Sequence, residues 1–133
     1  MASRMKQIWI IDDDEEMIHA INLMLKLLKH DSHYFLGARP AAQALLAGQC
    51  PDLLILDIHM PEVTGIDLLE FLRRREEWKD LPIVMLTTEA ADVMMDKALE
   101  IGADAYVTKP VSIKELEAAM QKAFAAREEV SNA

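Results

Sequence analysis

Short apolar runs alternate along the chain with longer segments of helical periodicity, and this alternation restricts the fold more than any other feature. The runs are Ile8–Ile11, His33–Leu36, Leu53–Leu56, Ile83–Leu86 and Ala105–Val107. The stronger runs do not alternate between apolar and polar residues, which is typical of strands that are buried on both faces. Such strands occur in parallel sheets that helices cover on both sides.

The segments between and after these runs predict amphipathic helices. From Glu15 to Lys29, for example, apolar residues recur at positions i, i+3, i+4 and i+7. The other expected helices are Pro40–Ala47, a helix capped by Thr64, a helix over about Ala91–Ile101, and a helix that starts at a capping box of Ser112 and Glu115. The strict alternation predicts an α/β fold, a doubly wound five-stranded parallel sheet with five helices. We expect the flavodoxin-like strand order 2-1-3-4-5.

Length and composition bound the class of protein. The 133 residues suit one domain, which we place at residues 6–126, between an N-terminal extension (1–5) and a C-terminal tail (127–133). The formal net charge of −9 disfavours nucleic acid and anionic membranes as direct partners, because both attract cationic surfaces. Cys50 is the single cysteine, and no apolar run approaches the roughly 20 residues of a membrane span. We therefore expect a cytoplasmic domain without a membrane segment.

Polar residues stand at the carboxyl ends of the expected strands, where parallel sheets bind their ligands. Asp12 and Asp13 follow the first run, Asp57 the third and Thr87 the fourth, and Lys109 lies just beyond the fifth. Neighbouring carboxylates about 5 Å apart repel by about 3 kcal/mol at an effective dielectric near 20, so the cluster takes up a proton or binds a cation. Oxygen ligands at few positions favour Mg²⁺. The combination predicts a site that forms an acyl phosphate. It consists of Mg²⁺, a nucleophilic carboxylate at Asp57, a hydroxyl and a lysine.

Four motifs resemble those of a known family. They are Ile10–Asp14, Leu56–Pro61 with Gly65 following, Met85–Thr88 and Tyr106–Pro110. In this order and at these strand ends, they resemble the receiver domains of two-component response regulators. The layout is most similar to that of the stand-alone chemotaxis type, and the resemblance covers about residues 6 to 126.

The resemblance implies a role for each matching residue of the metal site. Asp57 matches the phosphoacceptor and is also a metal ligand. Asp12 and Asp13 match the acidic pair that holds Mg²⁺, with Asp13 as the direct ligand. The main-chain carbonyl of His59 matches a further magnesium contact.

The resemblance also implies a switch. Thr87 and Lys109 match the hydroxyl and the amine that sense the phosphoryl group, and Tyr106 matches the aromatic switch residue. The bond between Lys109 and Pro110 is expected to be cis. Thr88 stands where a small alanine is usual, which bears on the lifetime of the phosphorylated state.

The same resemblance implies partners and an output. His59 and Glu89 match variable positions that tune dephosphorylation. A histidine kinase or a histidine phosphotransfer protein would supply the phosphoryl group, and a downstream protein would bind the face of the fourth helix, fifth strand and fifth helix. Beyond its own phosphorylation and dephosphorylation, the domain is not expected to be an enzyme. We expect a monomer that acts through another protein, and a homodimer stays open.

Three other functions can be weighed against this one. A phosphatase of the haloacid-dehalogenase kind carries its nucleophile in an Asp-x-Asp motif after the first strand. Here the candidate nucleophile is Asp57, and the residue two positions after it is His59. A nucleotide-binding Rossmann-like module would need clustered glycines, and the four glycines are scattered. A receiver-fold scaffold that never uses phosphate stays open, because only chemistry excludes it.

Three further features allow a purely structural interpretation. The run Arg73–Arg75 predicts a solvated helix end that favours the helix dipole. Asp14 is interpreted as a cap of the first helix. Met94 and Met95 fit either an exposed patch for a partner or ordinary core packing.

Overall fold

The computed structural model describes residues 5–88 and 93–131 of the chain. Its strands form one sheet in the order β2-β1-β3-β4-β5, and every neighbouring pair is parallel. The strands are β1 (Gln7–Ile11), β2 (Asp31–Phe35), β3 (Leu53–Asp57), β4 (Ile83–Thr87) and β5 (Ala105–Thr108). The predicted parallel sheet and its flavodoxin-like order are therefore confirmed.

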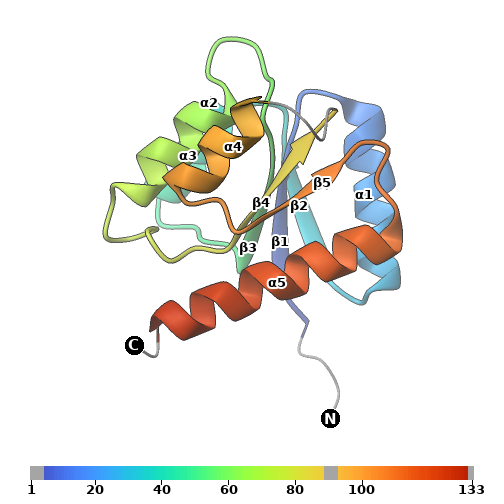
Figure 1. Ribbon diagram of the computed structural model, residues 1–133. Coiled ribbons are helices and arrows are strands. Elements are labelled where there is room, and N and C mark those ends of the chain that lie inside the picture. The colour runs from blue at the N-terminus through green and yellow to red at the C-terminus, as the bar shows by residue number, and fades with distance from the viewer. Residues whose placement is uncertain (1–4, 89–92, 132–133) are drawn as a thin grey trace.

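Helices cover both faces of this sheet (Figure 1). They are α1 (Glu15–Leu27), α2 (Ala38–Leu46), α3 (Gly65–Arg73), α4 (Val93–Ile101) and α5 (Ile113–Ser131). The helices α1 and α5 lie on one face, and α2, α3 and α4 lie on the other (Figure 1). The chain thus has the predicted doubly wound α/β architecture.

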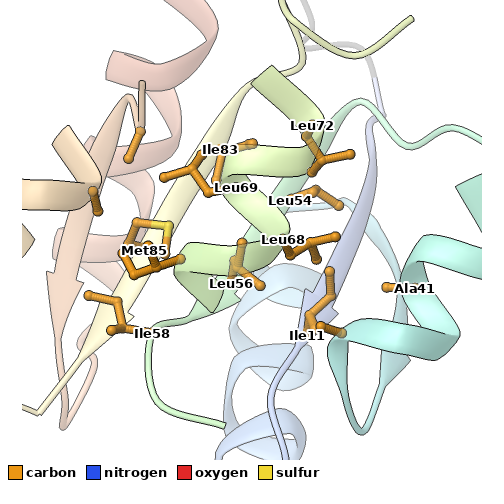
Figure 2. Packing of buried hydrophobic residues seen from close by; sticks show 14 of the residues in the cluster. Ile11, Ala41, Leu54, Leu56, Ile58, Leu68, Leu69, Leu72, Ile83 and Met85 are labelled. Carbon is orange, nitrogen blue, oxygen red and sulfur yellow. The ribbon is translucent and has the colours of Figure 1, made fainter. Parts of the chain in front are cut away.

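The core consists of two apolar layers, one on each face of the sheet. Ile8 and Ile10 of β1 belong to the layer under α1 and α5, whereas Trp9 and Ile11 belong to the layer under α2, α3 and α4. Every residue of β3 and β4 is buried, as the continuous apolar runs predict. Figure 2 shows the second layer, where α3 packs on the strands through Leu68, Leu69 and Leu72.

Side chains cap the helices as the sequence predicts. Asp14 accepts hydrogen bonds from two backbone amides in the first turn of α1. Thr64 and Asp67 form a capping box at the start of α3. Ser112 accepts a hydrogen bond from the backbone amide of Glu115 and donates one to its carboxylate. Each cap satisfies amides that have no acceptor within the helix.

The second strand and the second helix both begin earlier than the sequence predicts. The apolar pattern places the second strand at His33–Leu36, whereas β2 begins at Asp31 and ends at Phe35. β2 is an edge strand with exposed residues, so it carries no continuous apolar signal. α2 begins at Ala38, before Pro40, because first-turn amides lack an intrahelical acceptor and a proline there removes no hydrogen bond.

The last helix is longer than the sequence predicts. α5 continues to Ser131, past residue 126, where the apolar periodicity ends and a tail is expected. The side chain of Arg127 is only 17% exposed, because it binds a carboxylate before β5. Among residues 5–88 and 93–131, no helix combines the length and the apolar character needed to cross a membrane.

The two methionines of α4 contribute to packing. Met95 is buried in the core, and Met94 is partly buried against it. The preceding Val93 is exposed. Of the two interpretations of this segment, core packing is confirmed for the methionines.

Candidate functional site

Three aspartates gather at the carboxyl ends of β1 and β3, which are neighbours in the sheet. One carboxylate oxygen from each of Asp12, Asp13 and Asp57 lies within 4.8 Å of the others. Asp12 and Asp57 are buried, and Asp13 is exposed. Parallel strands end at the same edge of the sheet, which is why residues distant in sequence meet here.

The loop after β3 closes tightly over Asp57. The backbone amide of Gly65 donates a 3.0 Å hydrogen bond to the carbonyl of Ile58, so the loop folds back on the end of the strand. A Cβ atom on Gly65 would overlap the backbone carbonyl oxygen of Asp57. A glycine is therefore required here for the two backbone segments to approach each other.

Lys109 reaches the aspartates from the end of β5. Its Nζ lies 3.0 Å from Oδ2 of Asp12 and 3.6 Å from Oδ1 of Asp57. Its backbone amide donates a 2.7 Å hydrogen bond to the carbonyl of Thr87. The peptide bond to Pro110 is cis, as the resemblance implies. One cation thus serves both buried carboxylates.

The charges of these groups shift one another's pKa values. Burial, and then the charge of Asp12, raise the pKa of Asp57 to about 7, although Lys109 and the backbone amide of His59 act in the opposite direction. Burial lowers the pKa of Lys109, but the close contact with the carboxylate of Asp12 and the charge of Asp57 outweigh it, so the net shift is upward. The lysine is therefore cationic, and Asp57 readily accepts a proton or a cation.

The donor set fits a divalent cation that prefers hard oxygen ligands. Oδ2 of Asp12 is buried and accepts no well-aligned hydrogen bond from the described residues, although Nζ of Lys109 lies beside it. Oδ1 of the same residue accepts a 3.0 Å hydrogen bond from the backbone amide of Asp14. Lys109 brings one positive charge to three carboxylates, so a further cation stabilises the cluster when Asp57 is ionised. Together with Asp13 and Asp57, Asp12 can therefore hold a metal ion.

The remaining predicted residues lie at different depths around this cluster. Thr87 is fully buried at the carboxyl end of β4, the strand beside β3. His59 is exposed, and its backbone amide hydrogen-bonds to the carboxylate of Asp57. Tyr106 is 42% exposed on the edge strand β5. Glu89 lies outside the described residues.

A second cluster of charges lies at the other end of the strands, beside the amino ends of β4 and β5. The sequence does not predict it. Asp104, just before β5, accepts hydrogen bonds from Nη2 of Arg73 at 3.2 Å and from Nε of Arg127 at 2.7 Å. The interpretation of Arg73 as part of a solvated helix end is wrong, because its side chain is 9% exposed. The spacing of Arg73 could have indicated this burial. Arg73 stands two turns after Ile66 and so lies on the buried face of α3.

The sequence is similar to those of known regulators. The family described as Response regulator receiver domain matches residues 8–121. The chain is 34% identical over 116 residues to the phosphate regulon transcriptional regulatory protein PhoB of Pseudomonas aeruginosa, covering 87% of this chain and 50% of that protein. It is 36% identical over 113 residues to the transcriptional regulatory protein CpxR of Escherichia coli, covering 84% of this chain and 46% of that protein. The chain thus spans about half the length of these curated relatives.

Two solved structures share the fold over nearly their whole length. The chemotaxis protein CheY4 of Vibrio cholerae superposes with a TM-score of 0.79 at 26% identity, covering 90% of this chain and 99% of that one. A putative response regulator from Chloroflexus aurantiacus has a TM-score of 0.84 at 28% identity, covering 92% and 99%. Because the family match extends over most of the chain and the strand order agrees, this chain belongs to the response regulator receiver domains of two-component systems.

Proposed function

We propose that the protein is a phosphorylation-dependent signalling switch in which Asp57 accepts a phosphoryl group. The donor is the phosphohistidine of a histidine kinase or of a histidine phosphotransfer protein. An oxygen of Asp57 attacks phosphorus, the P–N bond to the donor imidazole breaks, and the leaving imidazole takes up a proton from solvent. The observation that carries the proposal is the buried carboxylate of Asp57 at the end of β3, with Asp12 and Lys109 beside it.

Mg²⁺ is the cation that we propose for the acidic cluster. The carboxylates of Asp12, Asp13 and Asp57 and the main-chain carbonyl of His59 would hold it. When bound, Mg²⁺ would neutralise charge on the phosphoryl oxygens. The exposure of Asp13 supports its role as the direct ligand, since its carboxylate is accessible to a hydrated ion.

Lys109 and Thr87 respond to the phosphoryl group. Nζ of Lys109 is 3.6 Å from Oδ1 of Asp57, so it pairs with the added charge after only a small movement. The hydroxyl of Thr87 donates a hydrogen bond to a phosphoryl oxygen, and Tyr106 then turns inward. This rearrangement changes the face formed by α4, β5 and α5, which binds the downstream protein.

The wider role follows from the same proposal. The net charge of −9 supports a protein partner rather than direct binding to nucleic acid. The chain matches about half the length of the curated relatives that are named as transcriptional regulators. We place the protein in the cytoplasm as a monomer that catalyses only its own phosphorylation and dephosphorylation.

Intact mass after incubation with acetyl phosphate, with and without Mg²⁺, tests the proposal. We expect one phosphoryl group on the natural chain with Mg²⁺ and none on Asp57→Asn. Asp96→Asn, at an exposed aspartate of α4, is the matched control and takes up the group normally. A folded natural chain that gains no phosphoryl group from acetyl phosphate or from a phosphohistidine donor contradicts the proposal. The domain would then be a scaffold that does not use phosphate.

A further inference from the structure

A network of one aspartate and two arginines joins several elements at the amino ends of β4 and β5. The acidic cluster lies at the carboxyl ends of the strands. We call Arg73, Asp104 and Arg127 the Asp104 network. The side chain of Asp104 is 1% exposed. Its Oδ2 accepts hydrogen bonds from Arg73 and, at 2.9 Å, from the backbone amide of Ile83, while its Oδ1 accepts one from Arg127. One buried carboxylate therefore connects α3, the start of β4, the segment before β5, and α5.

The two arginines also bind the backbone of the surrounding loops. The carbonyl of Gly102, between α4 and β5, accepts hydrogen bonds from Nε of Arg73 at 2.9 Å and from Nη2 of Arg127 at 3.1 Å. The carbonyl of Lys79, before β4, accepts from Nη1 of Arg73 at 3.1 Å and from Nη1 of Arg127 at 3.2 Å. In Figure 1 the C-terminal half of α5 runs beside the loop that precedes β4. The end of α4 and this loop are thus fixed to the same two side chains.

The Asp104 network lies at the amino ends of β4 and β5, whereas Thr87 and Lys109 lie at the carboxyl ends. β4 ends at Thr87 and β5 leads to Lys109, and Tyr106 stands on β5 two residues after Asp104. A five-residue and a four-residue strand, at about 3.3 Å per residue, separate the two ends by about 15 Å. Charged hydrogen bonds at the amino ends hold these strands in register while their carboxyl ends meet the acidic cluster.

We propose that the Asp104 network is the fixed anchor of the switch. It holds the amino ends of β4 and β5, the end of α4 and the C-terminal half of α5 in place. A change at Asp57 is therefore confined to the carboxyl ends of the strands and to the face above them. This proposal rests on the proposed phosphoacceptor function. Without the anchor, the elements of that face move in both states, and the two states differ less.

Backbone hydrogen exchange measured by mass spectrometry tests the anchor in the unphosphorylated protein. Arg127→Gln leaves Asp104 bonded to Arg73 and to the amide of Ile83, so the variant retains its fold. We expect amides of residues 101–108 and of the C-terminal half of α5 to exchange about tenfold faster than in the natural chain. Arg74→Gln is the control, because Arg74 stands beside Arg73 at the end of α3 and its side chain is 79% exposed. It should leave exchange unchanged.

A second arm compares each protein before and after phosphorylation by acetyl phosphate with Mg²⁺. We expect Arg127→Gln to gain the phosphoryl group at the natural rate, while the phosphorylation-induced change in exchange over α4, β5 and α5 falls about twofold or more. Arg127→Lys, which keeps the charge but not the paired contacts, should be intermediate.

Three results would overturn the anchor. The first is that amides of Arg127→Gln exchange at the rates of the natural chain in both arms. The second is a folded Arg127→Gln that gains no phosphoryl group, since the network would then serve the phosphoacceptor chemistry itself. The third is a natural chain that gains none, which overturns the proposed function and the switch role together. In that case the first arm still shows whether the network holds these elements in place.

Discussion

Nζ of Lys109 lies closer to Asp12, at 3.0 Å, than to Asp57, at 3.6 Å. In this state the lysine pairs more closely with a proposed metal ligand than with the proposed phosphoacceptor. A phosphoryl group on Asp57 adds negative charge with oxygens that project beyond the carboxylate. The same lysine therefore balances the acidic cluster before phosphorylation and the phosphoryl group afterwards.

Replacing Lys109 by Met should slow phosphorylation of Asp57. The change removes the charge and keeps the length of the side chain, so the phosphoryl oxygens lose a cationic partner. We expect the rate with acetyl phosphate to fall about tenfold to hundredfold, as measured by intact mass over time. Lys122→Met, at an exposed lysine of α5, should leave the rate unchanged. Equal rates in the natural chain and Lys109→Met would remove Lys109 from the reaction.

The titration of Asp57 should make stability depend on pH. Its pKa is raised from 3.8 to about 7, so between these values the folded chain holds a proton that the unfolded chain has released. Stability therefore falls as the pH rises through this window. Asp57→Asn removes this titration, and its stability relative to the natural chain should increase from pH 4 to pH 8. Urea unfolding of both proteins measures the difference, and a constant difference over this range contradicts the raised pKa.

Mg²⁺ should restore part of the stability that ionised Asp57 costs at pH 8. A ligand that binds only the folded state at ten times its dissociation constant stabilises by about 1.4 kcal/mol. We expect a rise in thermal unfolding temperature that depends on Mg²⁺ concentration and disappears in Asp13→Asn. Asp96→Asn should keep the full effect. If Asp13→Asn responds to Mg²⁺ as the natural chain does, the ion binds elsewhere.

The sequence predicts the sheet and the acidic cluster because each strand has a local apolar pattern and parallel strands place their carboxyl ends together. The run Ile8–Ile11 is buried on both faces, and Asp57 follows another such run, so topology alone brings it to Asp12. The Asp104 network is different, since Arg73 on α3 and Asp104 before β5 meet through side-chain packing that no strand pattern specifies. An isolated arginine on an apolar helix face signals burial without naming its partner.

The Asp104 network should contribute more to stability than its exposed neighbours. Asp104→Asn leaves Arg73 and Arg127 without the carboxylate that both bind, and both side chains are largely buried. Removing one member of a buried ion pair costs about 3–5 kcal/mol, because the remaining charge stays desolvated. We expect a loss of this size in urea unfolding. Asp96→Asn should change stability by less than about 0.5 kcal/mol. A similarly small loss for Asp104→Asn would show that water replaces the carboxylate.

A methyl group at Gly65 should displace the loop that closes over Asp57. The added Cβ would overlap the carbonyl oxygen of Asp57, and backbone atoms of the strand end give way less easily than a side chain. We expect Gly65→Ala to lower the free energy of unfolding by about 1–3 kcal/mol and to slow phosphorylation in the folded protein. Gly37→Ala is the matched control, because its φ of −170° suits alanine and the nearest atom to its Cβ is 3.8 Å away. If Gly65→Ala is as stable and as readily phosphorylated as Gly37→Ala, the position of Asp57 does not depend on this close backbone approach.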